Sequence, residues 1–286
     1  MRTHYLRDAH RNANYITIAI ITDIHLYPAV DGDPEAEGAS LNSWFYYAGS
    51  AKLRRFRDYV NSNDEIDFAL CLGDITDRYF DGFALFRSIW DGITKPKALT
   101  IGNHDLYLTD YSNVVTALGY DSMTENGGSK FNQKYHISGK NFDVGIITLD
   151  TNLSASGFVA SNTGWLVSDA RDWITTQCNN ATEKVILLAS HHSPQLHFEA
   201  TPDGWNAYAE LMNNIMINNP KKAFANITGH EHRFACPKCI TRNGSRIQNY
   251  MCPAALDYLP GRLSVLRIYY DGYIDHNTIG ANYPYD

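Results

Sequence analysis

The sequence predicts an α/β protein built around a largely parallel sheet. Short apolar runs rich in β-branched residues alternate with segments in which apolar residues recur every three or four positions. This alternation of strand-like and helix-like patterns is typical of parallel sheets. Five of the strand-like runs also lead directly into residues that can bind a metal ion. Because ligands gather outside the carboxyl ends of parallel strands, we expect one shared site there.

The five strand-like runs are each followed at once by a polar cluster. The first run, at residues 15–22, is rich in β-branched residues, which favour strands. The other runs are residues 66–72, 97–101, 184–189 and 223–228. In chain order, the clusters that follow are Asp23-Ile24-His25, Gly73-Asp74-Ile75-Thr76-Asp77, Gly102-Asn103-His104-Asp105, Ser190-His191-His192 and Gly229-His230-Glu231-His232. A glycine that begins a cluster lets the backbone turn sharply and approach a ligand closely.

Helix-like segments lie between and after these runs. We expect helices near residues 50–61, 81–90, 165–177 and 205–217, where apolar residues repeat at helical spacing. A chain of 286 residues can bury a large core, and α/β folds of this length are often one domain. We therefore expect residues 1–286 to form a single domain, with an irregular insertion at residues 27–50.

Composition and charge restrict the class of protein. The content of 44% hydrophobic and 19% charged residues is that of a globular protein, neither disordered nor fibrous. No apolar run approaches the roughly 20 residues that a membrane-spanning helix needs. The polar residues 1–14 lack the pattern of a secretory signal, and five cysteines do not resemble a disulfide framework, so we expect a cytoplasmic protein. A net charge of −7 argues against nucleic acid as a partner, but it is compatible with a small phosphoester held by metal ions.

The clusters concentrate residues that bind transition metals. Six of the 11 histidines lie in them. Imidazole, carboxylate and one amide oxygen suit manganese, iron, zinc or nickel better than calcium. Seven predicted ligands exceed what one tetrahedral ion needs, and this number indicates two ions; the ligands are Asp23, His25, Asp74, Asn103, His191, His230 and His232. Ions about 3.5–4 Å apart lower the pKa of a bridging water to about 7 and stabilise both oxygens of a phosphoryl transfer.

The order and spacing of the clusters resemble the calcineurin-like metallophosphoesterases. The motifs are Asp-x-His, Gly-Asp-x-x-Asp, Gly-Asn-His-Asp, a lone His and Gly-His-x-His, and together they span residues 23–232. The resemblance implies a four-layer α/β/β/α sandwich with a mixed central pair of sheets. It also implies that strands near residues 246–251 and 263–270 complete the second sheet.

The same resemblance implies how the residues divide their roles. Asp23, His25, Asp74 and His232 would hold the first metal, and Asp74, Asn103, His191 and His230 the second, with Asp74 as the bridge. His104 would bind a phosphate oxygen and protonate the leaving alkoxide, with Asp77 orienting its ring. An imidazole with a reference pKa near 6.5 can donate a proton near neutral pH, which supports this role independently.

Further motifs resemble one branch of the family, which includes bacterial cyclic-nucleotide and glycerophosphodiester phosphodiesterases. These motifs are Asp23-Ile24-His25-Leu26, Leu149-Asp150-Thr151-Asn152, Gly164-Trp165-Leu166 and His191-His192-Ser193-Pro194. The branch usually has proline where Ser193 stands. The resemblance therefore implies hydrolysis of a small phosphodiester, either a nucleotide or a glycerophosphodiester, by a hydroxide that bridges the metals. A phosphomonoesterase, a DNA nuclease of the same superfamily and a non-catalytic scaffold are the alternatives.

Two regions leave their role open. The insertion at residues 27–50 carries four acidic residues and the aromatic run Trp44-Phe45-Tyr46-Tyr47, which would either stack on a base or pack over the core. We expect Tyr27, His192, Asn103 and His104 to contact the substrate. Cys236 and Cys239 have the spacing of half a zinc site, but free thiols near a hairpin around residues 242–244 are the simpler interpretation.

Overall fold

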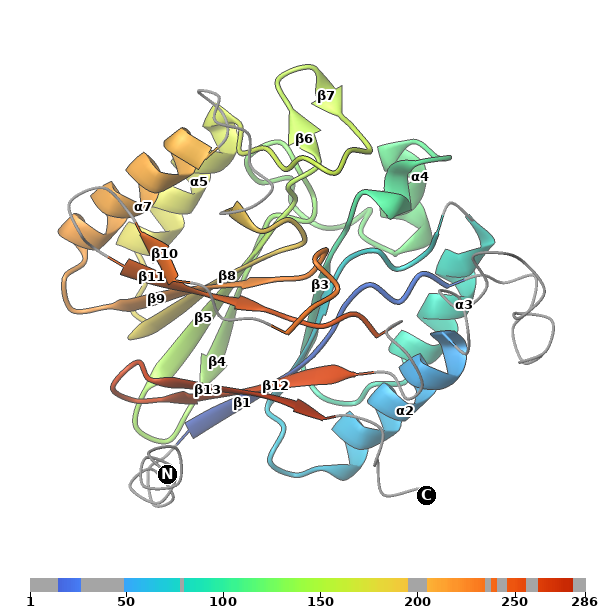
Figure 1. The fold of residues 1–286 in the computed structure, drawn as a ribbon, viewed down its shortest axis with the longest axis horizontal. Coiled ribbons are helices and arrows are strands. Elements are labelled where there is room, and N and C mark those ends of the chain that lie inside the picture. Colours follow the sequence, from blue (N-terminus) through green and yellow to red (C-terminus); the bar gives the residue numbers. More distant parts are fainter. Residues whose placement is uncertain are drawn as a thin grey trace.

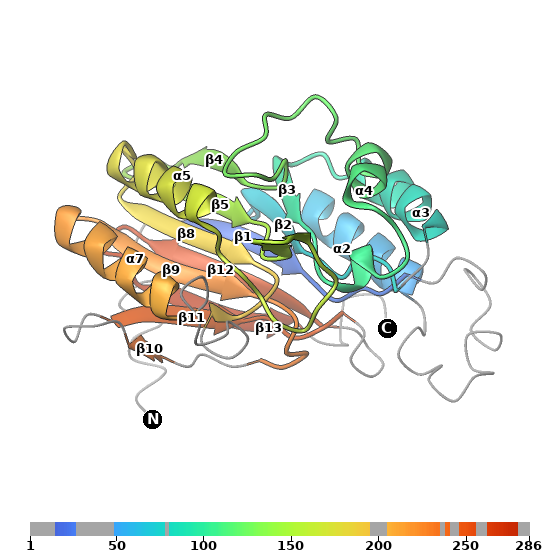
Figure 2. The same cartoon turned by 90° about the horizontal axis from the view of Figure 1, so that it is seen from above.

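The computed structural model describes residues 15–26, 49–77, 80–194, 205–234, 238–240, 246–255 and 262–279. Two β-sheets pack face to face, and helices cover the outer face of each (Figures 1 and 2). The predicted four-layer α/β/β/α sandwich is confirmed. Tyr27 and residues 28–48 of the predicted insertion lie outside the described residues, while residues 49 and 50 begin a helix and do not belong to an irregular segment.

The first sheet has five strands in the order β13-β12-β1-β2-β3. Its parallel part consists of β1 (Tyr15–Ile21), β2 (Phe68–Leu72) and β3 (Lys97–Thr100). β12 (Leu263–Tyr269) pairs antiparallel with β1, and β13 (Ile274–Ile279) pairs antiparallel with β12. Three of the predicted ligand-bearing strands therefore end at the same edge of this sheet.

The second sheet has six strands in the order β10-β11-β9-β8-β5-β4. Strands β5 (Asp143–Leu149), β8 (Val185–Ser190), β9 (Ala223–Thr228) and β11 (Arg246–Met251) are parallel. The edge strands β4 (Gln133–Ser138) and β10 (Lys238–Ile240) are antiparallel to their neighbours. A separate hairpin pairs β6 (Leu153–Ser154) with β7 (Gly157–Phe158).

The alternating direction of side chains along β1 explains how the first sheet packs against both neighbouring layers. Ile16, Ile18 and Ile20 are buried between the two sheets, whereas Ala19 and Ile21 face the helical layer. That layer contains α2 (Gly49–Ser62), α3 (Asp81–Trp90) and α4 (Tyr111–Ala117). The other outer layer contains α5 (Ser168–Asn179) and α7 (Trp205–Asn218), which cover the second sheet. Successive strand residues point to opposite faces, so both faces of β1 are buried and its run is continuously apolar.

Two expectations about the elements need correction. The strands near residues 246–251 and 263–270 do not complete one sheet, because β11 joins the second sheet and β12 joins the first. The helix expected from residue 165 begins at Ser168, since Val167, the residue before it, has extended backbone. The periodicity of the sequence also did not predict the strand pair formed by β4 and β5. Strand order depends on contacts between distant segments, which local periodicity does not encode.

The predicted hairpin near residue 243 is supported by the antiparallel pairing of β10 with β11, although the turn itself lies outside the described residues. Cys252 is buried just beyond β11, and the side chains of Cys236 and Cys239 are not described. Within the described part of the chain, no helix is long and apolar enough to cross a membrane.

Candidate metal centre

The five polar clusters meet at the carboxyl ends of β1, β2, β3, β8 and β9. Backbone hydrogen bonds join the loops of one sheet, since the amides of Asp23 and His25 donate to the carbonyls of Gly73 and Asp74 at 3.0 and 2.9 Å. The two sheets are also joined, because the His230 amide donates to Asp23 Oδ2 at 3.1 Å. Side chains from positions 23 to 232 thereby form one cluster, as the strand-end pattern predicted.

The backbone at this cluster is strained. Among the described residues, the non-glycine positions with positive φ are all predicted ligands: Asp23, His25, Asp74, His230 and His232. Left-handed backbone is sparsely populated by residues with a Cβ and costs about 1–3 kcal/mol at each position. The fold maintains this strain at five ligand positions, which indicates that side-chain direction here is under functional constraint.

Glycines allow the loops to approach one another. A Cβ at Gly102 would lie 2.2 Å from Asp74 Oδ1, and a Cβ at Gly229 would lie 2.1 Å from Thr22 Oγ1. No larger residue fits at either position without moving a ligand loop. The glycines that begin the third and fifth clusters therefore serve close packing of the ligand loops.

Asp74 lies between two groups of ligands. Its Oδ2 is 3.5 Å from His25 Nε2 and 3.2 Å from His191 Nε2. On one side, Asp23, His25 and His232 bring their ligand atoms within 4.8 Å of one another, with His232 Nε2 3.2 Å from Asp23 Oδ1. On the other side, His230 Nδ1 lies 3.1 Å from His191 Nε2. The structure thus brings together the six histidine and aspartate ligands that the sequence predicted.

The donor atoms in this cluster are suited to cations. His191 uses Nδ1 to donate to the Leu72 carbonyl at 2.8 Å, so in the neutral ring the Nε2 lone pair faces the Asp74 carboxylate. Two acceptors at this distance need a positive charge between them. Among the described residues, buried His25 Nε2 and Asn103 Oδ1 also have no hydrogen-bond partner. These residues fit a metal site, because imidazole, carboxylate and amide ligand atoms converge there and most of them are buried.

Electrostatics at the cluster favour anionic aspartates beside positive charge. Burial acts to raise the pKa of Asp23, but the neighbouring His232 and His191 lower it to about 2. Burial likewise acts to lower the pKa of His191, yet the carboxylates of Asp74 and Asp23 raise it to about 9. The position between Asp74 and His191 is therefore one where a cation is stabilised.

His104 lies beside this cluster and is hydrogen-bonded through Nδ1 to Asp77 Oδ1, the pairing of residues that the family resemblance implied. Asp77 is buried, whereas a quarter of the His104 side chain is exposed. Burial acts to lower the pKa of His104, but the hydrogen bond to Asp77 and the charge of Asp74 raise it. The His104 amide also donates to Asp74 Oδ1 at 2.9 Å, which fixes the ring close to the ligands.

Asp105 has a structural role that the motif did not reveal. Its Oδ1 accepts hydrogen bonds from the amides of Ile75 and Thr76 at 2.9 and 3.0 Å, and its Oδ2 accepts one from Gly102 at 2.9 Å. This buried carboxylate therefore holds the second and third ligand loops together. Its place in the Gly-Asn-His-Asp motif was the available signal, but only its contacts show what it does.

His192, expected at the substrate, is adjacent to the cluster but faces protein groups. Its Nδ1 is 2.8 Å from Thr151 Oγ1, and its Nε2 is 3.0 Å from the Ser161 carbonyl. Both ring nitrogens are thus engaged, which favours a positioning role for His192. Tyr27, the other expected substrate residue outside the motifs, is not among the described residues.

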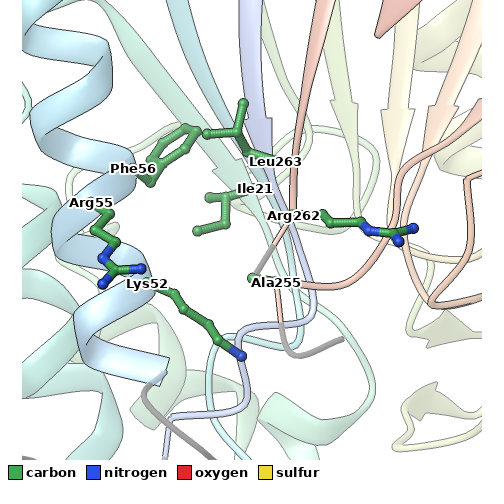
Figure 3. A pocket seen from close by; sticks show the side chains of 7 residues that line it. All are labelled: Ile21, Lys52, Arg55, Phe56, Ala255, Arg262 and Leu263. Carbon is green, nitrogen blue, oxygen red and sulfur yellow. The ribbon is translucent and has the colours of Figure 1, made fainter. Parts of the chain in front are cut away.

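A small hollow beside the end of β1 is distinct from this cluster. Lys52 and Arg55 on α2, together with Ile21 and Arg262, are among the residues that line it, and the Arg262 side chain points away from the helix (Figure 3). Its volume is about 10 Å³, close to the roughly 10–15 Å³ that one water needs. A substrate phosphate does not fit there, so the ligand cluster is the better candidate for the site of chemistry.

Solved structures with this fold include two phosphate-releasing enzymes by name. A dimetal phosphatase from Danio rerio is 16% identical with a TM-score of 0.64, over 93% of this chain and 99% of that chain. A 5'-nucleotidase from Candida albicans is 14% identical with a TM-score of 0.54, over 95% of this chain and 52% of that chain, so this chain spans about half its length. No curated protein matches the sequence.

The fold and the ligand cluster define the class of protein, a metal-dependent hydrolase that acts on phosphoesters. The model of the calcineurin-like phosphoesterase family matches residues 16–234, the span that contains all seven predicted ligands. The chain belongs to the calcineurin-like phosphoesterase family.

Proposed function

We propose that this chain hydrolyses a small phosphodiester with two transition-metal ions, chosen from manganese, iron, zinc and nickel. The observation that carries the proposal is the position of Asp74 Oδ2, which faces His25 on one side and His191 on the other. Asp23, His25, Asp74 and His232 would hold one ion, and Asp74, Asn103, His191 and His230 the other. When bound, such ions activate water and neutralise charge that develops on the phosphoryl group.

His104 is the proton donor in this proposal. Because Asp77 accepts the Nδ1 hydrogen, the protonated ring offers its Nε2 hydrogen to the substrate. The raised pKa of His104 keeps this proton available near neutral pH. The leaving oxygen takes the proton as its bond to phosphorus breaks, and the departing alcohol is therefore neutral.

The preference for a diester rests on the motifs that resemble the bacterial phosphodiesterase branch, namely residues 23–26, 149–152, 164–166 and 191–194. A phosphomonoester is the competing substrate class, favoured by the names of the two solved structures, a dimetal phosphatase and a 5'-nucleotidase. The net charge of −7 favours a small substrate over nucleic acid, since polyanions bind mainly through Lys and Arg.

One substrate panel tests the proposal. The purified protein is reconstituted separately with manganese, zinc, iron and nickel, and hydrolysis is measured on bis(p-nitrophenyl) phosphate, p-nitrophenyl phosphate, cyclic nucleotides and DNA. We expect higher kcat/KM on the small diesters than on the monoester. Equal or higher activity on the monoester contradicts the diester preference. If no metal supports hydrolysis of any substrate, the catalytic proposal itself fails.

A further inference from the structure

Two oxygen atoms lie near the side-chain nitrogen of Asn103. Its Nδ2 lies 3.4 Å from the Tyr107 hydroxyl and 3.4 Å from Asn162 Oδ1. Its Oδ1, on the other side of the amide, is buried and has no hydrogen-bond partner among the residues that the structure describes. An amide nitrogen carries two hydrogens and an amide oxygen carries only lone pairs, so Asn162 Oδ1, which can only accept, selects the nitrogen and leaves the oxygen for the cluster. The Tyr107 hydroxyl accepts the second hydrogen of the same nitrogen.

We propose that Asn162 and Tyr107 are positioning residues that set the orientation of the Asn103 amide for metal binding. This inference rests on the proposed function, in which Asn103 Oδ1 binds the second ion. If the amide rotated by half a turn, its NH₂ group would face the cations and its oxygen would face Asn162 Oδ1, which cannot donate a hydrogen bond. Both changes are unfavourable, because cation binding requires a lone pair at the ligand atom.

The loop that carries Asn162 is itself fixed by hydrogen bonds around the neighbouring residue. His192 Nε2 donates to the Ser161 carbonyl at 3.0 Å, and the Thr151 hydroxyl donates to His192 Nδ1 at 2.8 Å. The amide of Trp165 donates to the Thr151 carbonyl at 3.0 Å. His192 is fully buried, so it holds the loop from within the protein. The two adjacent histidines thus differ in role. His191 is one of the predicted metal ligands, and His192 holds the loop that orients Asn103.

Tyr107 connects this arrangement to the proton donor. Its ring contacts the His104 ring edge to face, with centroids 4.9 Å apart and planes at 82°. Tyr107 is the residue after the 3-10 turn η3 (His104–Leu106), so the turn places its hydroxyl near Asn103 and its ring against His104. One side chain therefore contacts both the amide ligand and the catalytic imidazole.

Metal binding tests this inference without a measurement of activity. Wild-type protein and the Asn162→Ala, Tyr107→Phe and double variants are loaded with manganese, and affinity for each ion is measured by chelator competition and metal analysis. We expect the first ion to bind unchanged, while affinity for the second falls about threefold to tenfold for each hydrogen bond lost. Asn162→Asp keeps the acceptor oxygen and should retain the second ion. Thr163→Ala, on the same loop, and Tyr273→Phe, on a distant turn, are matched controls.

The outcomes separate this inference from the proposed function. Unchanged affinity for both ions in the double variant overturns the inference and leaves the metal centre intact. Weakening of both ions to the same degree also overturns it, because a general loss of structure and not the Asn103 amide would be the cause. Circular dichroism and thermal unfolding identify a variant that fails to fold. Wild-type protein that binds no transition metal overturns the proposed function together with the inference.

Discussion

Asp74 Oδ2 and His191 Nε2 lie 3.2 Å apart, and both side chains are buried. The same carboxylate oxygen also faces His25, so it belongs to both ligand groups. Loss of the Asp74 carboxylate would therefore affect both ligand groups directly, whereas loss of a ligand in one group would directly affect that group only.

Asp74→Asn tests this shared position. The substitution keeps the size of the side chain and an oxygen that can accept from the His104 amide, but it removes the negative charge. We expect loss of at least one ion and a fall in kcat/KM of roughly 100-fold or more, the upper range for disturbed metal sites. Metal analysis and steady-state kinetics provide the measurements. Asp58→Asn, an exposed change on α2, is the matched control, and two ions retained in Asp74→Asn would contradict the bridging assignment.

His104→Ala should separate proton donation from metal binding. The seven ligands remain, so we expect the variant to keep its ions. Its rate on substrates with alkyl leaving groups should fall about 10²–10⁴-fold, the range for general acid catalysis, and less on p-nitrophenyl esters, whose leaving group needs no proton. Kinetics on a matched pair of alkyl and aryl diesters provide the measurement. An equal loss on both substrates would indicate that His104 does not act as the acid.

Asp77→Asn should change the pH dependence of the reaction. The proton donor works while His104 is protonated, so activity is lost as pH rises through the pKa of His104. Because the hydrogen bond to Asp77 raises that pKa, its removal should move the alkaline limb of kcat to lower pH. A kcat profile on an alkyl diester from acid to alkaline pH checks the direction. A limb that stays in place would show that another group controls it.

Local sequence was sufficient to predict the ligand cluster but not its supports. Asp23, His25, Asp74 and their partners lie directly after strand-like runs, so pattern and chemistry coincide at those positions. Asn162, in contrast, is one residue of a loop 59 positions from Asn103, and no local pattern marks it. Its role depends on a three-dimensional contact that forms only when the loop that carries Asn162 folds against Asn103.

The same limit applies to the sheets. A strand was expected near residues 263–270, yet its place beside β1 depends on register pairs such as Ala19 with Val265. Periodicity shows which faces of a strand are apolar, but it does not identify the neighbour. The four-layer arrangement was predicted because the motifs resemble a known family, whereas the strand order required the structure.

Gly102→Ala tests whether close loop packing supports metal binding. The new Cβ would lie 2.2 Å from Asp74 Oδ1 and 2.6 Å from the Asp74 amide, so the bridging ligand must move. We expect weaker binding of both ions and a loss of about 1–3 kcal/mol in the free energy of unfolding, as for overpacked cores. Gly145→Ala on β5 is the control, because its Cβ would meet Glu183 at an ordinary 3.4 Å. Equal metal affinity in the two variants would contradict the packing argument.

His276 should make the fold sensitive to acid independently of the metal centre. It lies on β13, with Nε2 3.0 Å from Ser264 Oγ and its ring near Phe234 and Tyr250. Burial lowers its pKa from 6.5 to about 4, so between these values the unfolded chain binds a proton that the folded chain does not. Stability is therefore lost as pH falls through this window, by about 3 kcal/mol at most.

In His276→Gln, which keeps a hydrogen-bonding group toward Ser264, the loss of stability between pH 7 and pH 4 should be smaller by up to that amount. Urea unfolding of both proteins across this range measures the difference, and parallel stability curves would show that His276 does not titrate in this way.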